Sequence, residues 1–152
     1  MRFVFTNKLI QEKDCYDRFN NIVLELCCNN MNEIVINSPI LEKYIRENYP
    51  EYKFISSTTK CLTDLENAKK EINNSDYILT CIDYNLNKNY PFLESLSPKE
   101  KAKTELLVNA ICGPGCPNRA EHYTLNSLYA LNYGKLYNIK NCSIEYKNLY
   151  PV

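Results

Sequence analysis

The residues best suited to chemistry gather in one short segment near the C-terminal end of the sequence. Cys112 and Cys116 enclose the tripeptide Gly-Pro-Gly, and the chain has only 3 glycines in all. Glycine allows backbone conformations that other residues avoid, so such a loop can turn both thiols toward one point. The segment predicts either a metal site, since thiolates bind zinc and iron–sulfur clusters, or two reduced thiols in a tight structural turn.

Two thiolates do not complete a metal site, so further ligands must come from elsewhere in the chain. Cys142 and the single histidine, His122, would complete a Cys3His set. Such a set suits zinc or, less commonly, an iron–sulfur cluster. If neither binds there, we expect the protein to have no cofactor. The three-cysteine CxxxCxxC pattern of radical enzymes is excluded, because its third position is Arg119.

Three residues are candidates for catalysis. Arg119 and His122 are three apart, which places them on one face of a helix that we expect to open at Pro117. The guanidinium fork of Arg119 suits a substrate carboxylate or phosphate, and a histidine side chain titrates near neutral pH and can act as acid or base. Asp83 can orient a base or a water molecule. The alternatives are a surface salt bridge for Arg119, a capping or core role for His122 and simple solvation for Asp83.

Five short apolar segments, separated by helical patterns, must position these residues. Because most of them are apolar without alternation, they are typical of parallel strands covered on both faces. We therefore predict an α/β fold of about five parallel βα units, with strands over Arg2–Thr6, Glu33–Asn37, Lys53–Ser56, Tyr77–Ile82 and Thr104–Asn109.

Polar residues follow these strands. Ligands of parallel α/β folds bind at the carboxyl ends of the strands, where the βα loops converge. We therefore expect Asn109, Lys60 and Asn85 to contribute to substrate binding beside Asp83. The alternative is that Asn, Asp and Ser stand there as ordinary turn formers.

The helical segments carry apolar stripes and start signals. One stripe is expected to cover the sheet, and it contains Cys15, Phe19, Ile22, Val23, Leu26 and Cys27. Capping boxes are predicted at Thr63–Glu66 and Ser97–Glu100, and Ser38 precedes Pro39 in a further N-cap arrangement.

The number of units leaves two architectures open. Eight βα units close a TIM-type barrel, so five fit either a portion of a barrel whose first strands are absent or an open parallel sheet with helices on both faces. We expect residues 1–134 to form one α/β domain and residues 135–152 to be a C-terminal tail that packs on it.

The segment from Glu105 to Tyr123, together with the strand pattern before it, resembles the collagenase-like peptidase family of bacterial β/α-barrel proteins. The resemblance implies a longer barrel enzyme with a cysteine-containing loop after a strand. Several members of that family are iron–sulfur proteins that act in hydroxylation rather than proteolysis. The implied activity is therefore hydrolase-like or iron–sulfur-dependent, on a small-molecule or peptide substrate.

Composition restricts the partners. Lys and Arg number 18 and so do Asp and Glu, which gives no electrostatic signature for nucleic acid or an anionic membrane. No signal peptide or spanning segment is recognisable, and 8 cysteines without one indicate a reducing, cytoplasmic location. The sequence thus predicts a metal- or iron–sulfur-binding β/α enzyme or enzyme portion. The alternative is a noncatalytic interaction module with a structural cysteine loop, whose exposed strand edges lead to self-association.

Overall fold

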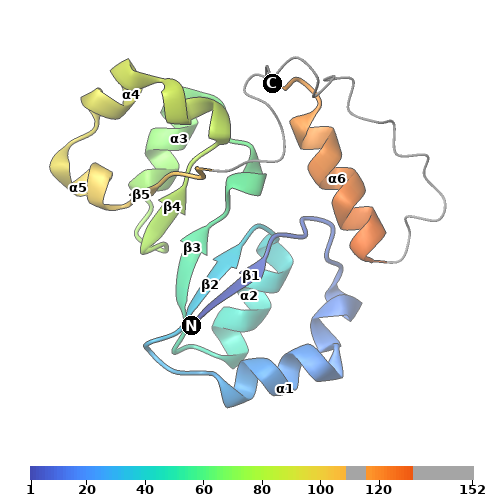
Figure 1. Cartoon of the computed structure of the whole chain (residues 1–152). Coiled ribbons are helices and arrows are strands. Elements are labelled where there is room, and N and C mark those ends of the chain that lie inside the picture. The colour runs from blue at the N-terminus through green and yellow to red at the C-terminus, as the bar shows by residue number, and fades with distance from the viewer. Residues whose placement is uncertain (109–115, 132–152) are drawn as a thin grey trace, which may run out of the picture.

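The computed structural model describes residues 1–108 and 116–131, and its centre is an all-parallel sheet of five strands (Figure 1). The strands lie side by side in chain order, as β1 (Arg2–Phe5), β2 (Glu33–Ile36), β3 (Lys53–Ser56), β4 (Leu79–Cys81) and β5 (Thr104–Glu105). The predicted α/β class and the five parallel strands are confirmed. β5 ends earlier than predicted, and Asn109, the expected last residue of this strand, lies outside the described residues.

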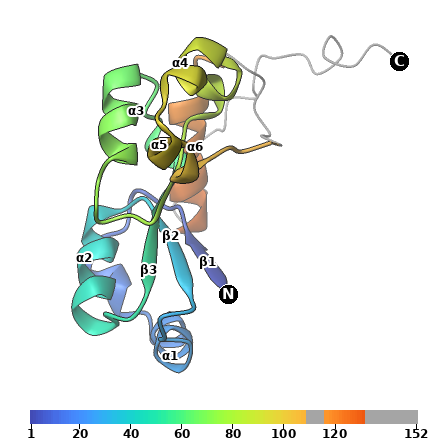
Figure 2. The same ribbon diagram turned by 90° about the vertical axis from the view of Figure 1, so that its left-hand side faces the viewer.

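Helices fill each connection between strands. They are the 3-10 helices η1 (Glu12–Tyr16), η2 (Thr58–Lys60) and η3 (Tyr84–Lys88), and the α-helices α1 (Arg18–Leu26), α2 (Pro39–Asn48), α3 (Leu65–Ile72), α4 (Tyr90–Ser95) and α5 (Pro98–Ala102). A further helix, α6 (Arg119–Ala130), follows β5. α2 and α3 lie together on one side of the strands, and α6 lies away from them (Figure 2). The Asn7 side chain donates to the Ser127 carbonyl at 3.1 Å, which holds α6 beside the carboxyl end of β1.

Alternate strand residues face the helices and form the core. Ile34, Ile36 and Phe54 are buried in a cluster with Leu24 of α1 and Ile45 of α2. A second cluster joins α3 to the segment after β4, through Ile72, Ile82, Leu86, Phe92 and Leu96. Burial of these side chains is the main force that fixes the helices on the sheet.

The sheet curls strongly. β1 and β5 are the outermost strands, yet Arg2 of β1 donates to both carboxylate oxygens of Glu105 in β5, at 2.8 and 2.9 Å. Arg2 also donates to Glu33 of β2 at 3.0 Å. Within the described residues the sheet stays open, because no strand pairing joins β1 to β5.

Two of the three predicted N-caps are confirmed, and the helix that was expected to open at Pro117 begins at Arg119. Ser38 caps α2, and Ser97 and Glu100 form a capping box at α5. Hydrogen bonds from the side chain of Asn73 and from Ser97 lower the pKa of Glu100 to about 2. The prediction at Thr63 is wrong by one residue, because the side chain of Asp64 accepts from the Asn67 amide at 2.9 Å and caps α3 instead.

The predicted inner face of the first helical segment is wrong in part. Cys15 is buried as expected, but Phe19, Ile22 and Leu26 are 73%, 45% and 80% exposed. Leu24, which the stripe did not include, is the buried residue of α1. The reason is that α1 carries apolar residues on both sides, so periodicity alone does not say which side faces the sheet.

Nothing in the described ranges 1–108 and 116–131 forms a helix long and apolar enough to span a membrane. The expected tail, residues 135–152, lies outside the described residues.

Candidate functional site

A pocket of about 400 Å³ opens at the carboxyl edge of the sheet. Its walls come from the loops after β3 and β4 and from the start of α6, so three segments distant in sequence meet there. The lining residues are Cys61, Thr63, Asp83, Asn85, Cys116, Pro117, Arg119 and Ala120. Four residues that the sequence analysis selected, Asp83, Asn85, Cys116 and Arg119, are therefore brought together.

Asp83 is fixed in the pocket wall by its place in the chain. It comes two residues after β4 and is the N-cap of η3, where its Oδ1 accepts from the Asn85 amide at 2.8 Å. An aspartate at an N-cap satisfies a backbone N–H that the first turn would otherwise leave unbonded. Only 1% of Asp83 is exposed.

Arg119 is the charge partner of Asp83. Its Nη1 donates to Asp83 Oδ1 at 3.0 Å, and its guanidinium lies 5.1 Å from the centre of the Tyr84 ring. The two side chains are 4% and 1% exposed. A buried pair of this kind is costly to break, because removal of one partner leaves the other charge without compensation. The pair joins the first residue of α6 to the N-cap of η3.

The second carboxylate oxygen of Asp83, Oδ2, differs from Oδ1 in its hydrogen bonding. Asp83 Oδ2 is buried and has no hydrogen-bond partner among residues 1–108 and 116–131. Buried polar atoms are nearly always hydrogen-bonded, so an exception calls for an explanation. Asp83 lines the pocket, and a carboxylate oxygen without a protein partner can accept a proton from a ligand or bind a cation.

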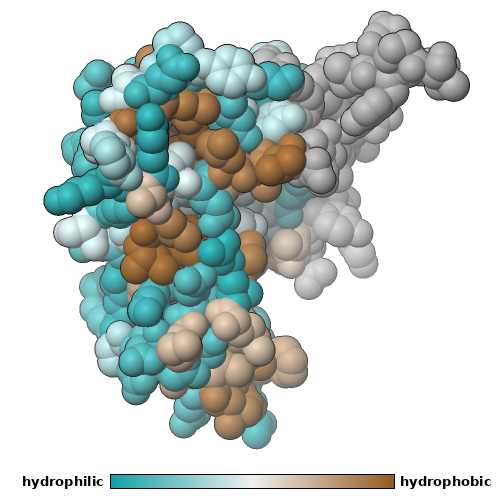
Figure 3. All heavy atoms as spheres, turned by 60° about the vertical axis from the view of Figure 1, so that its left-hand side comes forward, coloured by the Kyte–Doolittle hydropathy of each residue, from teal (hydrophilic) through white to brown (hydrophobic). Residues whose placement is uncertain are grey.

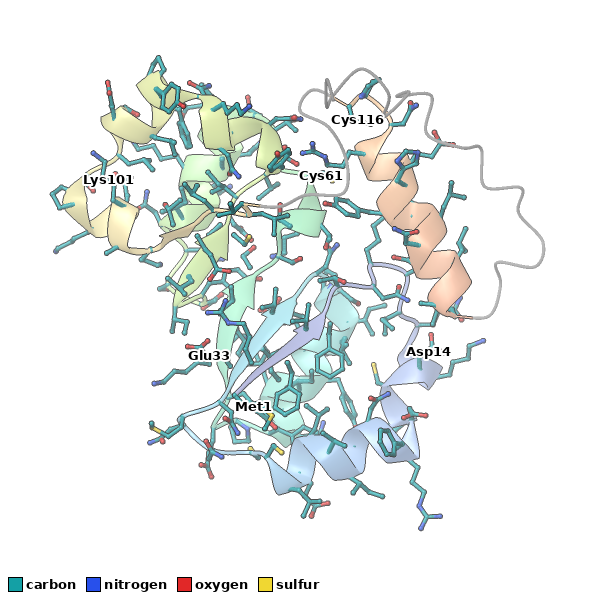
Figure 4. All side chains as sticks on the ribbon, viewed as in Figure 1. Met1, Asp14, Glu33, Cys61, Lys101 and Cys116 are labelled. Atoms are coloured by element: carbon teal, nitrogen blue, oxygen red, sulfur yellow. The ribbon has the colours of Figure 1, made fainter. Side chains whose placement is uncertain are left out.

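Two thiols line the same pocket. Cys116 is 5% exposed, and Cys61 is partly buried directly after η2 (Figure 4). Cys61 has φ 55° and ψ 45°, and it is the only non-glycine with positive φ in the described part of the chain. The left-handed conformation is unfavourable for a residue with a Cβ and is concentrated at functional positions.

The sequence analysis did not select Cys61 as a candidate residue. A signal was present, since Cys61 directly follows the polar run Ser56–Lys60 at the end of a predicted strand. Cys81, by contrast, is a core residue, and burial raises the pKa of its thiol to about 11.

The residues of the pocket meet the requirements of a metal site only in part. Cysteine thiolates and a carboxylate are suitable zinc ligands, but within residues 1–108 and 116–131 no group of three His, Cys, Asp or Glu side chains is close enough to hold one ion. Of the predicted ligands, Cys116 lies in the pocket, whereas Cys112 and Cys142 lie outside the described residues. Asn109, a predicted substrate contact, also lies outside them.

His122 lies in the first turns of α6 and is partly buried. It is absent from the described pocket lining, and its backbone amide donates to the Asn118 carbonyl at 2.9 Å. Within the described residues, the pocket thus contains the predicted Arg119 but not its helical neighbour His122.

Lys60 lies in a different environment from its neighbour Cys61. Its Nζ donates to Glu71 Oε1 at 2.7 Å and to the Tyr77 hydroxyl at 3.0 Å, and Tyr77 in turn donates to Glu42 at 2.7 Å. Burial tends to raise the pKa of Glu71, but the hydrogen bonds from Lys60 and Ser56 outweigh it and lower that pKa. Lys60 is part of this network between α2 and α3 and does not line the pocket.

Comparison with known proteins found no matching family model, no similar curated protein and no similar solved structure.

Proposed function

We propose that the chain is an enzyme, or a portion of one, that binds a metal ion or an iron–sulfur cluster at the carboxyl edge of its parallel sheet. One observation carries the proposal: Asp83, whose Oδ2 has no partner among residues 1–108 and 116–131, lines one pocket together with Cys61 and Cys116. Sulfur donors are typical of zinc and iron sites rather than of magnesium or calcium sites. Because no three His, Cys, Asp or Glu side chains lie close enough to hold one ion within residues 1–108 and 116–131, the proposal needs Cys112 and Cys142 to complete the ligand set.

The proposed ligands extend the predicted set. Cys116 and Cys61 supply thiolates from the described part of the pocket, and Cys112 and Cys142 remain proposed ligands. A bound zinc ion would supply Lewis acidity and a more acidic water molecule, whereas a cluster would supply electron transfer.

In this proposal Asp83 and Arg119 have different roles. Asp83 Oδ2 accepts a proton from a water molecule or substrate hydroxyl, while the bonds to Arg119 and to the Asn85 amide hold Oδ1 in place. Because Arg119 is 3% exposed and already bound to Asp83, we assign it the positioning of Asp83 rather than direct binding of an anionic substrate.

We further propose that the sheet is a portion of a β/α barrel. Strands in chain order, helices α1 and α2 packed against one face and the contact between Arg2 and Glu105 support this proposal. A barrel of the collagenase-like peptidase type would act on a peptide or small molecule at this edge of the sheet.

The test is metal content after purification without oxygen. Iron and zinc per chain and the visible spectrum are measured for wild type, Cys116→Ser, Cys61→Ser and the control Cys28→Ser, which alters a partly buried thiol on the first core cluster. We expect near-stoichiometric metal in wild type and control, its loss in Cys116→Ser and a clear decrease in Cys61→Ser. A brown protein indicates iron–sulfur and a colourless one zinc.

Equal far-ultraviolet circular dichroism of all four proteins shows that any loss of metal is not a loss of fold. Metal in none of them would overturn the proposal. The second candidate would then be favoured, a noncatalytic interaction module with a structural cysteine loop, which the exposed apolar side chains of α1 support.

A further inference from the structure

The outer face of α1 is an apolar surface. Phe19, Ile22 and Leu26 follow one another at helical spacing, and Phe19 and Leu26 are 73% and 80% exposed. Tyr16 before the helix and Met31 after it are also exposed. Figure 3 shows apolar atoms at the lower end of the molecule, where α1 lies. A single exposed apolar side chain is ordinary, but a row of them on one helix indicates an interaction surface.

The opposite face of α1 is also apolar. Leu24 is 2% exposed and belongs to the main core, and Cys27 and Cys28 pack against the same cluster. A helix that is apolar on both sides is normally covered on both sides. The inner cover is the sheet, so the outer face is expected to have a cover of its own.

Charges beside the apolar row indicate what that cover is. Arg18 lies four residues before Ile22 and Glu25 three residues after it, so both border the same side of the row. Both are exposed, and neither forms an ion pair within residues 1–108 and 116–131. If a second α1 lies antiparallel across the first with Ile22 at the centre, Arg18 of each copy lies opposite Glu25 of the other.

A hollow continues the surface toward α2. It has a volume of about 310 Å³ and is lined by Glu12, Cys15, Tyr16, Ile40, Lys43, Tyr44 and Glu47. Tyr16, which is exposed just before the apolar row, also lines the hollow, so side chains at the margin of a partner helix have a place to enter.

We propose that this face binds a second copy of the same chain, through a two-fold antiparallel contact of α1 with α1. The apolar row supplies the buried area, and two symmetric pairs of Arg18 with Glu25 fix the antiparallel direction. Because the contact involves one short helix and its margins, the dimer is weak and depends on concentration. The inference is independent of the metal site.

The test is sedimentation velocity over a series of protein concentrations. The variants are Arg18→Glu and Glu25→Arg, studied alone and mixed in equal amounts. Each alone places like charges opposite each other at two points, and we expect its dimer dissociation constant to increase about tenfold. In the mixture all four charges are complementary, and we expect the dissociation constant to return to that of wild type. Leu65→Lys, on the exposed side of α3, is the control and should dimerise like wild type.

Two outcomes would overturn the proposal. A wild-type monomer at every concentration would show that the face does not bind a second copy and would assign it to a different partner. Dimerisation of wild type without rescue in the mixture would place the interface elsewhere on the molecule. Metal content is measured on the same samples, and it should not differ between these variants and wild type.

Discussion

Two buried polar clusters of this protein contrast in how completely they are bonded. Around Lys60, the ammonium, the Glu71 carboxylate and the Tyr77 hydroxyl all have partners, and no buried polar side-chain atom of that network lacks one within the described residues. At the pocket, Asp83 and Arg119 form a more deeply buried pair, yet Asp83 Oδ2 has no partner there.

The difference separates a structural network from a candidate site. The Lys60 network connects α2 to α3, and its hydrogen bonds account for every charge in it, which is what a structural role requires. At the pocket, Asp83 Oδ2 has no partner within the described residues, although such an atom costs free energy when it is buried. Mutations in the two clusters should therefore change the stability of the protein by different amounts.

The largest expected effect is that of Arg119→Ala. It leaves the Asp83 carboxylate buried without its cation and also releases the start of α6, so the free energy of unfolding should fall by about 3–5 kcal/mol. Urea denaturation followed by circular dichroism measures the change. The control is Lys43→Ala, whose ion pair with Glu47 is exposed and long at 3.9 Å, and it should change stability by less than about 0.5 kcal/mol. Equal effects of the two substitutions would show that the buried pair is not a structural link.

A smaller effect is expected for Lys60→Met. Glu71 keeps the hydrogen bond from Ser56 and Tyr77 keeps its bond to Glu42, so the loss should be about 1–2 kcal/mol near neutral pH. The pH dependence gives a second readout. Because the folded-state pKa of Glu71 lies below its ordinary value of 4.5, its contribution to stability is present above pH 4.5 and is lost as the pH falls below that value.

Without Lys60 this pKa difference shrinks, so the decrease in stability between neutral pH and acid should be less steep in Lys60→Met than in wild type. Parallel pH profiles of the two proteins would contradict the assignment of Lys60 as the partner that lowers the pKa of Glu71.

Much of the fold follows from local patterns in the sequence. The strands are short apolar runs with polar residues at their ends, and the caps at Ser38 and Ser97 depend only on neighbouring residues. The orientation of α1 does not follow in this way, because both of its faces are apolar and the outcome depends on how the helix packs against the sheet.

The candidate site was also predictable only in part, because some of its residues are placed by local patterns and others by how the chain packs. Strand order places Asp83 and Asn85 at the carboxyl edge, and a helix that begins at Arg119 can reach that edge. Lys60 and Cys61 are neighbours in sequence, yet one joins the network at α3 and the other lines the pocket. That divergence depends on the left-handed turn at Cys61, which residue type did not indicate.

The most direct test of the central claim is a titration of the metal-free protein with cobalt(II), followed by absorption spectroscopy. Cobalt occupies zinc sites, and cobalt–thiolate bonds absorb strongly in the near ultraviolet. We predict a saturable thiolate band in wild type, its loss in Cys116→Ser and weaker binding in Asp83→Asn, with Lys60→Met like wild type. The absence of a thiolate band in wild type, or an undiminished band in Cys116→Ser, would contradict the claim that thiols of this pocket bind a metal ion.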